Sequence, residues 1–137
     1  MDEDIKYCAE CGDVNVHLHH IVFKSECKPL ENCKLNFVYL CIKHHQDHKE
    51  GVHHNYNLNR KYKLKFQNSL EILWDKQYLT REEINEVLGI ADKPLDGLLK
   101  VLTLQNGKYV REDIIRACMG GKLIIEENKN EKVKDSI

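Results

Sequence analysis

Apolar and polar positions alternate differently in the two halves of this chain, and the change predicts extended segments first and helices afterwards. Residues 16–23 and residues 37–40 have the short, apolar-rich character of extended segments. The polar segment that follows them, residues 41–50, predicts a helix for which Gly51 would be the C-cap. The first half is therefore expected to form a β-hairpin followed by a helix.

In the second half, apolar residues recur at the spacing of a helix. Residues 58–77 predict one long amphipathic helix with a basic beginning. Thr80 has Glu83 three residues later, which is the pattern of a capping box, and this predicts a helix that ends at Gly89. Pro94 places the start of a further helix one or two residues earlier.

The two short helices are joined by a tight turn and are a helix-turn-helix candidate. The dipeptide Asn106-Gly107 predicts a type I′ hairpin directly after them, which would be a wing. Residues 111–119 predict a last short helix. The segment 126–137 is charged with almost no apolar residues, so it is expected to be disordered.

Length and charge limit the classes of protein that this chain can be. Its 137 residues suffice for one ordinary domain, or for two small ones if a metal supports them. We predict a first domain at residues 1–57 and a helical module at residues 58–125. The net charge of -1 gives no overall basic signature, so contacts with nucleic acid must come from local patches.

The expected location is the cytoplasm, with no membrane partner. No apolar run approaches the roughly 20 residues that a membrane span needs. The acidic start, Met1-Asp2-Glu3-Asp4, has the wrong charge for a secretory signal. Thiols stay reduced in the cytoplasm, so closely spaced cysteines are interpreted as metal ligands in preference to a disulfide.

Cysteine and histidine gather in the first half, and all eight histidines fall within residues 17–54. Cys8 and Cys11 form a pair with a two-residue gap, and Cys41 and His44 form a second pair with the same gap. A structural zinc ion takes four ligands in a tetrahedron, commonly from two such pairs. The spacing therefore predicts a structural Zn²⁺ site made of three cysteines and one histidine.

Between the two pairs stands the sequence His19-His20-Ile21, and it is followed by Asn36 and then by His45, directly after the fourth zinc ligand. This nested order resembles the HNH endonucleases, also called His-Me finger or ββα-metal endonucleases, and most closely those of phages and mobile elements with a zinc knuckle pair. The resemblance covers about residues 5 to 54. It implies an α+β protein with a zinc-stabilised ββα-metal domain, followed here by an α-helical module with a candidate winged helix-turn-helix.

The resemblance implies a role for each residue of the motif. His20 takes the position of the general base, and an imidazole that titrates near neutrality can accept a proton from water. Asn36 takes the position whose side-chain amide bonds the backbone of the loop carrying the base. His19 and His45 take the positions that bind the catalytic divalent cation. Because neighbouring strand residues face opposite sides, a bulge or strained turn is expected to bring both histidines to one site.

The third metal position departs from some relatives, which have a histidine where this chain has Lys49. His48 and His53 remain as candidates, and His53 is the preferred third ligand; phosphate and water completing the shell is the alternative. Imidazole ligands suit transition metals, although a site that keeps its waters also works with Mg²⁺. The expected catalytic cofactor is therefore Mg²⁺, Mn²⁺ or another divalent cation. His17 and His54 have no role in the motif.

Four basic residues near the start of the long helix are candidates for contacts with DNA phosphates: Arg60, Lys61, Lys63 and Lys65. A solvated helix face is the alternative. The second helix of the predicted helix-turn-helix has few polar groups suited to base edges, so a module that packs, or that forms a homodimer, also stays open.

The whole pattern predicts a divalent-metal-dependent DNA endonuclease that nicks double-stranded DNA. The main alternative is a phage-type regulator or anti-defence factor, which would bind DNA or a protein partner of phage or host through the same scaffold without cleaving. An RNA-directed nuclease is a third interpretation.

Overall fold

A computed structural model describes residues 5–47 and 50–125. In those residues, two small antiparallel sheets and five α-helices form a mixed α+β structure, which confirms the predicted class. None of these helices combines the length and the apolar character needed to cross a membrane. The segment 126–137, predicted to be disordered, lies outside the described residues. The elements follow in the order β1 (Val16–His20), η1 (Lys28–Leu30), η2 (Lys34–Asn36), β2 (Phe37–Cys41), α1 (Ile42–Gln46), α2 (Tyr56–Leu73), β3 (Tyr78–Leu79), α3 (Arg81–Leu88), α4 (Asp92–Leu99), β4 (Leu104–Gln105), β5 (Lys108–Val110) and α5 (Arg111–Cys118).

Strands β1 and β2 form the predicted hairpin. Their antiparallel register runs without interruption from Val16 opposite Cys41 to His20 opposite Phe37. The strand therefore has no bulge, which was one of the two expected ways to bring His19 and His20 to one site; a strained turn was the other. His20 is the last paired residue of β1, and its side chain lines the same cavity as His19.

Helix α1 directly follows β2 and is shorter than predicted. It ends at Gln46 with Asp47 as its C-cap, so the prediction that Gly51 caps this helix is wrong. Gly51 packs closely against the turn instead, since an added Cβ would lie 2.4 Å from the backbone nitrogen of Asp47. This approach returns the chain toward α1, where Val52 is buried and donates its backbone N–H to the carbonyl of His44 at 2.7 Å.

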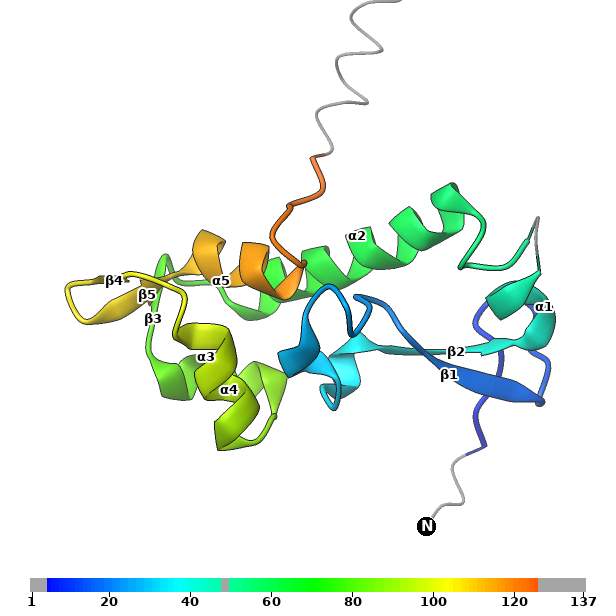
Figure 1. Ribbon diagram of the computed structural model, residues 1–137, viewed down its shortest axis with the longest axis horizontal. Helices are drawn as coiled ribbons and strands as arrows, with labels where there is room; N and C mark the ends of the chain where they lie inside the picture. The colour runs from blue at the N-terminus through cyan, green and yellow to red at the C-terminus, as the bar shows by residue number, and fades with distance from the viewer. Residues whose placement is uncertain (1–4, 48–49, 126–137) are drawn as a thin grey trace, which may run out of the picture.

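Helix α2 is the predicted long helix, and it runs across the middle of the molecule above the hairpin (Figure 1). It begins earlier than predicted because Asn55 is its N-cap, whose side chain accepts a hydrogen bond from the backbone N–H of Leu58 at 3.0 Å. Its buried stripe includes Tyr62, Phe66 and Leu70, which follow one another at intervals of four residues, as the buried face of an amphipathic helix allows.

The elements after α2 follow the predicted turn chemistry. The capping box is complete, since Glu83 donates its backbone N–H to the Thr80 hydroxyl at 3.1 Å and Thr80 donates its own to the Glu83 carboxylate at 2.9 Å. Gly89 ends α3 with a φ of 61°. Asn106 and Gly107 both have the positive φ that a type I′ turn needs. Strand β5 pairs with both β4 and β3, so the hairpin is anchored beside the two short helices.

One continuous apolar core runs through both predicted domains. It includes Leu40 and Val52 from the first part, Phe66 and Trp74 from the region of α2, and Ile114 from α5. The loop element η1 also packs against α4. The division at residue 57 stays a prediction, and the packing shows that the second part supports the hairpin from one side.

Candidate functional site

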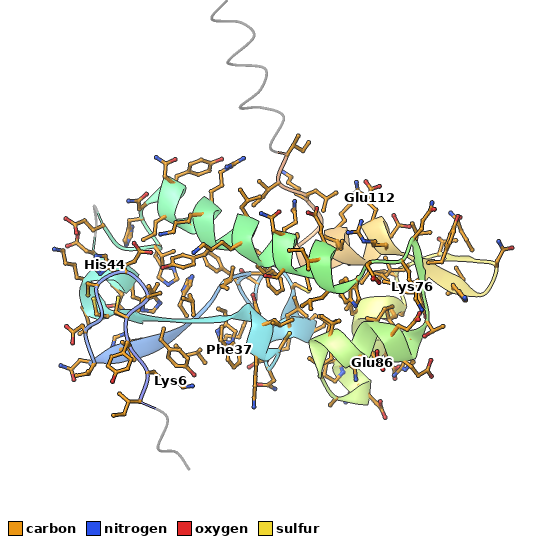
Figure 2. The ribbon with its side chains drawn as sticks, turned by 180° about the vertical axis from the view of Figure 1, so that it is seen from behind. Lys6, Phe37, His44, Lys76, Glu86 and Glu112 are labelled. Carbon is orange, nitrogen blue, oxygen red and sulfur yellow. The ribbon has the colours of Figure 1, made fainter. Side chains whose placement is uncertain are left out.

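The predicted metal ligands gather at one end of the molecule. Figure 2 shows this end by the labelled His44, with Lys76 and Glu112 near the opposite end. Two separate groups of cysteine and histidine side chains lie there, where the N-terminal turn, β1, β2 and α1 meet. Each group brings its ligand atoms within 4.8 Å of one another.

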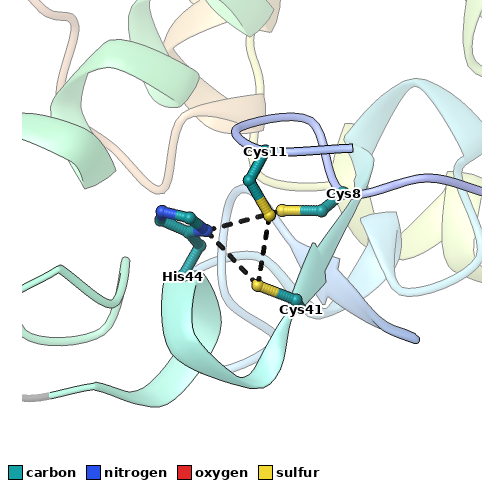
Figure 3. A group of neighbouring side chains, drawn as sticks. All are labelled: Cys8, Cys11, Cys41 and His44. Carbon is teal, nitrogen blue, oxygen red and sulfur yellow. Dashed lines mark hydrogen bonds between the residues drawn. The ribbon is translucent and has the colours of Figure 1, made fainter. Parts of the chain in front are cut away.

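The first group consists of the four predicted zinc ligands, Cys8, Cys11, Cys41 and His44 (Figure 3). The two N-terminal cysteines come from a tight turn, which Gly12 closes by donating its backbone N–H to the Cys8 carbonyl at 2.8 Å. Gly12 has a φ of 81°, a conformation that favours glycine. The other two ligands come from the end of β2 and the start of α1, so the group ties three segments together.

The distances in this group suit a tetrahedral ion. The Sγ atoms of Cys11 and Cys41 are 3.7 Å apart, and Nδ1 of His44 lies 3.3 Å from Sγ of Cys41 and 3.7 Å from Sγ of Cys8. Zinc with Zn–S bonds of about 2.3 Å and Zn–N bonds of about 2.05 Å places two sulfurs about 3.8 Å apart and a sulfur and a nitrogen about 3.6 Å apart. The cluster can therefore hold a metal ion such as zinc.

Electrostatics favour the thiolate at Cys8 but not at Cys11. A backbone hydrogen bond of Asp13 lowers the pKa of the Cys11 thiol, but burial and the neighbouring Cys8 and Cys41 outweigh it and raise this pKa. Burial raises the pKa of the Cys8 thiol, but backbone hydrogen bonds, that of Cys41 foremost, outweigh burial and lower this pKa to about 6. The thiolate, which is the ligand form, therefore prevails at neutral pH. On the other side of the His44 ring, Nε2 lies 3.9 Å from the Glu50 carboxylate, a group of the kind that orients metal-binding imidazoles.

The second group consists of His19, His45 and His53. They come from β1, from α1 and from the turn after α1, and Nε2 of His45 lies 2.9 Å from Nε2 of His53. The structure thus brings together the two metal positions implied by the HNH resemblance and the preferred third ligand. The other candidate for that position, His48, and Lys49, which replaces the histidine of some relatives, lie outside the described residues.

His19 is the buried member of this group, with 2% of its surface exposed. Burial foremost, and then the neighbouring His53 and His45, lower the pKa of His19 to about 3, so its imidazole is neutral at neutral pH. Its Nε2 is buried and has no hydrogen-bond partner among the described residues. Such a group is costly unless something binds it. A cation held by three imidazoles would use this nitrogen, so the residues suit a second metal site.

His20 lies beside this group. Its Nε2 is 2.8 Å from the carbonyl oxygen of Glu31. Because a carbonyl oxygen only accepts, Nε2 carries the proton and Nδ1 holds the lone pair. One cavity of about 170 Å³ brings the proposed base together with the three clustered histidines. The residues that line it are Leu18, His19, His20, Phe23, Lys24, His45 and His53.

Asn36 is completely buried and holds the loop between the strands. Its Oδ1 accepts from the backbone N–H of Val22 at 2.7 Å, and its Nδ2 donates to the carbonyls of Val22 at 2.9 Å and Leu30 at 3.4 Å. Glu31, whose carbonyl accepts from His20, directly follows Leu30. The asparagine therefore fixes the backbone that orients the histidine, which is the role implied by the resemblance.

His17 has no role in the motif, but it contacts His45 at the candidate site. Its Nδ1 lies 3.4 Å from Nδ1 of His45. His17 and His19 share one face of β1, because strand side chains return to the same face at every second residue. The spacing of these two histidines was the signal available in the sequence.

The four basic residues predicted to contact phosphate occupy two sides of α2, Arg60 with Lys63 and Lys61 with Lys65, because residues three or four apart share a helix face. Lys61 forms an ion pair with Glu10 at 2.9 Å. Arg60 and Lys63 line a cavity of about 400 Å³. The Lys63 ammonium lies 4.8 Å from the ring centroid of Phe23, which also lines the histidine cavity. Lys63 therefore joins the linings of the two cavities, and its ammonium also pairs with the Glu26 carboxylate at 2.7 Å.

Comparison of this chain with family models, with curated proteins and with solved structures finds no match in any of the three. The assignment to the HNH endonucleases accordingly stays a proposal, and its support is the motif together with the geometry of the two clusters.

Proposed function

We propose that this chain is a zinc-stabilised, divalent-metal-dependent endonuclease of the HNH type. The observation that carries the proposal is the convergence of His19, His45 and His53 beside His20 in one cavity. Phosphodiester hydrolysis needs a base for the attacking water and a cation for the charge that develops on the phosphate. The cavity supplies groups suited to both needs.

His20 acts as the general base through Nδ1, the nitrogen that holds the lone pair. When Nδ1 takes the proton of a water molecule, the ring becomes positively charged. The Glu31 carbonyl, 2.8 Å from Nε2, stabilises that charge and keeps the ring in place. Asn36 holds the two sides of the loop together, so the orientation of the base does not depend on solvent.

His19, His45 and His53 hold the divalent cation, which supplies charge stabilisation for the phosphate and for the leaving 3′ oxygen. Three nitrogen ligands favour a transition-metal ion over Mg²⁺. We therefore expect higher activity with Mn²⁺ or Ni²⁺ than with Mg²⁺.

The Cys₃His group has a supporting role in this proposal. In this proposal His44 is a zinc ligand, and His45, the next residue on α1, lines the histidine cavity. A zinc ion bound to His44 therefore fixes the helix that carries His45. Loss of this ion is expected to disorganise the second site as well as the fold around it.

Double-stranded DNA is the proposed substrate. Its phosphate backbone would pass from the histidine cavity over Lys63 and Arg60, where a phosphate would compete with the Glu26 carboxylate that pairs with Lys63 at 2.7 Å. The order β3-α3-α4-β4-β5 supports a winged helix-turn-helix in the second part. However, Asp96 on α4 pairs with Arg81 at 2.6 Å, and this acidic group weakens the helix as a reader of bases. Nicking without strong sequence preference is the expected activity.

A plasmid-nicking assay tests the proposal with the zinc-loaded protein and with Mn²⁺, Ni²⁺ or Mg²⁺. We expect His20→Ala to retain its zinc and its circular-dichroism spectrum but to cleave about 10²- to 10⁴-fold more slowly, the usual contribution of a general base. The matched control is His54→Ala, which removes a histidine that does not line the cavity. Nicking by His20→Ala at the wild-type rate would refute the assignment of the base.

Two further outcomes separate the alternatives. Binding of DNA without any cleavage, in every metal tested, would favour the regulator interpretation. Faster cleavage of RNA than of DNA, when both are offered together, would replace the proposed substrate.

A further inference from the structure

His45 lies between two other histidines, one at each of its ring nitrogens. Its Nε2 is 2.9 Å from Nε2 of His53, and its Nδ1 is 3.4 Å from Nδ1 of His17. The ring planes of His17 and His45 are nearly perpendicular, at 81°. The two contacts lie on different sides, because His53 lines the histidine cavity together with His45, whereas His17 lines a different depression next to Cys41.

The two nitrogens of a neutral imidazole have different roles in hydrogen bonding and metal binding. One carries a proton and donates, and the other holds a lone pair and can bind a cation. The nitrogen of His45 on the side of the cavity is Nε2, so a cation bound by His19, His45 and His53 uses that lone pair. Nδ1 must then carry the proton, and the group in front of it is Nδ1 of His17, which can accept it.

We propose that His17 is a positioning residue, which accepts a hydrogen bond from Nδ1 of His45 and so holds this ring in the tautomer and orientation that bind the divalent cation through Nε2. The inference rests on the proposed function, because it concerns the same three-histidine site. Removal of a residue that hydrogen-bonds a metal-binding histidine typically lowers the metal affinity by roughly 10- to 100-fold.

The position of His17 makes this role testable without damage to the core. Its side chain is exposed on β1, so replacing it opens no cavity. Asparagine and leucine have the same number and branching of side-chain heavy atoms, and Oδ1 of asparagine lies about where Nδ1 of histidine lies, whereas leucine has no acceptor. His17→Asn and His17→Leu therefore form a matched pair that differs in the hydrogen bond.

The experiment uses the full chain loaded with one equivalent of zinc, to which Ni²⁺ is added in a calorimeter, with zinc counted afterwards to show that the Cys₃His group kept its ion. We expect one Ni²⁺ site in the wild type. Affinity in His17→Asn is expected to stay within about threefold of the wild type, and affinity in His17→Leu to fall by roughly 10- to 100-fold. With a second equivalent of diamagnetic Zn²⁺ in place of paramagnetic Ni²⁺, nitrogen-15 NMR is expected to show the Nδ1–H of His45 in the wild type.

The outcomes distinguish the two proposals. A wild-type protein that binds no Ni²⁺ beyond its zinc would remove the three-histidine site, and with it both the proposed function and this inference. Equal affinity in the wild type and in His17→Leu would overturn the role of His17 alone. Equal loss in both variants would also overturn it, because the histidine ring itself, not its acceptor nitrogen, would then be required.

Discussion

Replacement of Asn36 by alanine removes the side chain that joins the two sides of the loop between β1 and β2. Asn36 and Val22 are both 0% exposed, so water cannot replace the lost partners without opening the core. The backbone N–H and carbonyl of Val22 would both lose their hydrogen bonds, which are 2.7 and 2.9 Å long. The longer contact to the Leu30 carbonyl would be lost as well.

The expected loss in the free energy of unfolding follows from the number of buried polar groups left without a hydrogen-bond partner. Each unsatisfied buried donor or acceptor costs roughly 1–3 kcal/mol, so the two Val22 groups together cost about 2–6 kcal/mol. Since a small domain is stable by only about 5–15 kcal/mol, this is a large fraction of the whole. Asn36→Ala is therefore expected to unfold at a much lower urea concentration than the wild type.

Urea unfolding of both proteins, followed by circular dichroism with zinc held in excess, measures this difference. The matched control is Asn32→Ala, an exposed asparagine in the same loop, which is expected to change the free energy of unfolding by less than about 0.5 kcal/mol. An Asn36→Ala protein within about 0.5 kcal/mol of the wild type would refute the reasoning. It would show that the loop does not depend on the buried amide for its conformation.

Three other predictions test the site and its supports. Cys41→Ser removes a zinc ligand, so zinc bound per chain, measured by mass spectrometry, is expected to fall well below one equivalent and the near-ultraviolet signal of the first part to be lost. Gly51→Ala places a methyl group 2.4 Å from the backbone of Asp47, which is expected to cost about 1–3 kcal/mol in thermal or urea unfolding and to weaken Ni²⁺ binding by moving His53. The Lys76 ammonium foremost lowers the pKa of Glu83 to about 2, below its ordinary value of 4.5. The ionised Glu83 thus stabilises the fold fully above about pH 4.5, and this contribution is lost as pH falls toward 2; the difference in stability between the wild type and Glu83→Gln is expected to shrink over that range.

Each of these predictions has a result that contradicts it. A Cys41→Ser protein with one tightly bound zinc and wild-type unfolding would exclude the Cys₃His site. Gly97→Ala is the control for Gly51→Ala, because its added methyl group meets nothing closer than 3.9 Å, and equal effects of the two would exclude the close approach at Gly51. A stability difference for Glu83→Gln that stays constant between pH 2 and 4.5 would contradict the lowered pKa of this carboxyl.

Local chemistry made several features predictable from the sequence. The pairs Cys8–Cys11 and Cys41–His44 predicted a metal cluster, because a two-residue gap in a tight turn brings both side chains to one point. The capping box of Thr80 was readable for the same reason, since all its contacts lie within one helical turn. In each case the interacting atoms are separated by a few residues, and the local backbone decides their distance.

Helix ends and faces were harder to predict. The expectation that Gly51 caps α1 was wrong, because a glycine can serve either a positive φ or a close backbone approach, and the sequence does not distinguish them. The basic residues of α2 looked like one group in the sequence. Helical geometry separates Lys63, which pairs with Glu26, from Lys61, which pairs with Glu10 more than 50 residues away in the chain.

The sequence by itself determined the ligand types of both clusters, the extended and helical segments that carry them, and the tight turns between the later elements. Only the tertiary structure decided that His53 completes a group with His19 and His45, and that His17 lies against the outer nitrogen of His45. These placements depend on how a strand, a short helix and a returning turn pack together. Packing of that kind is governed by the whole core, which no local spacing encodes.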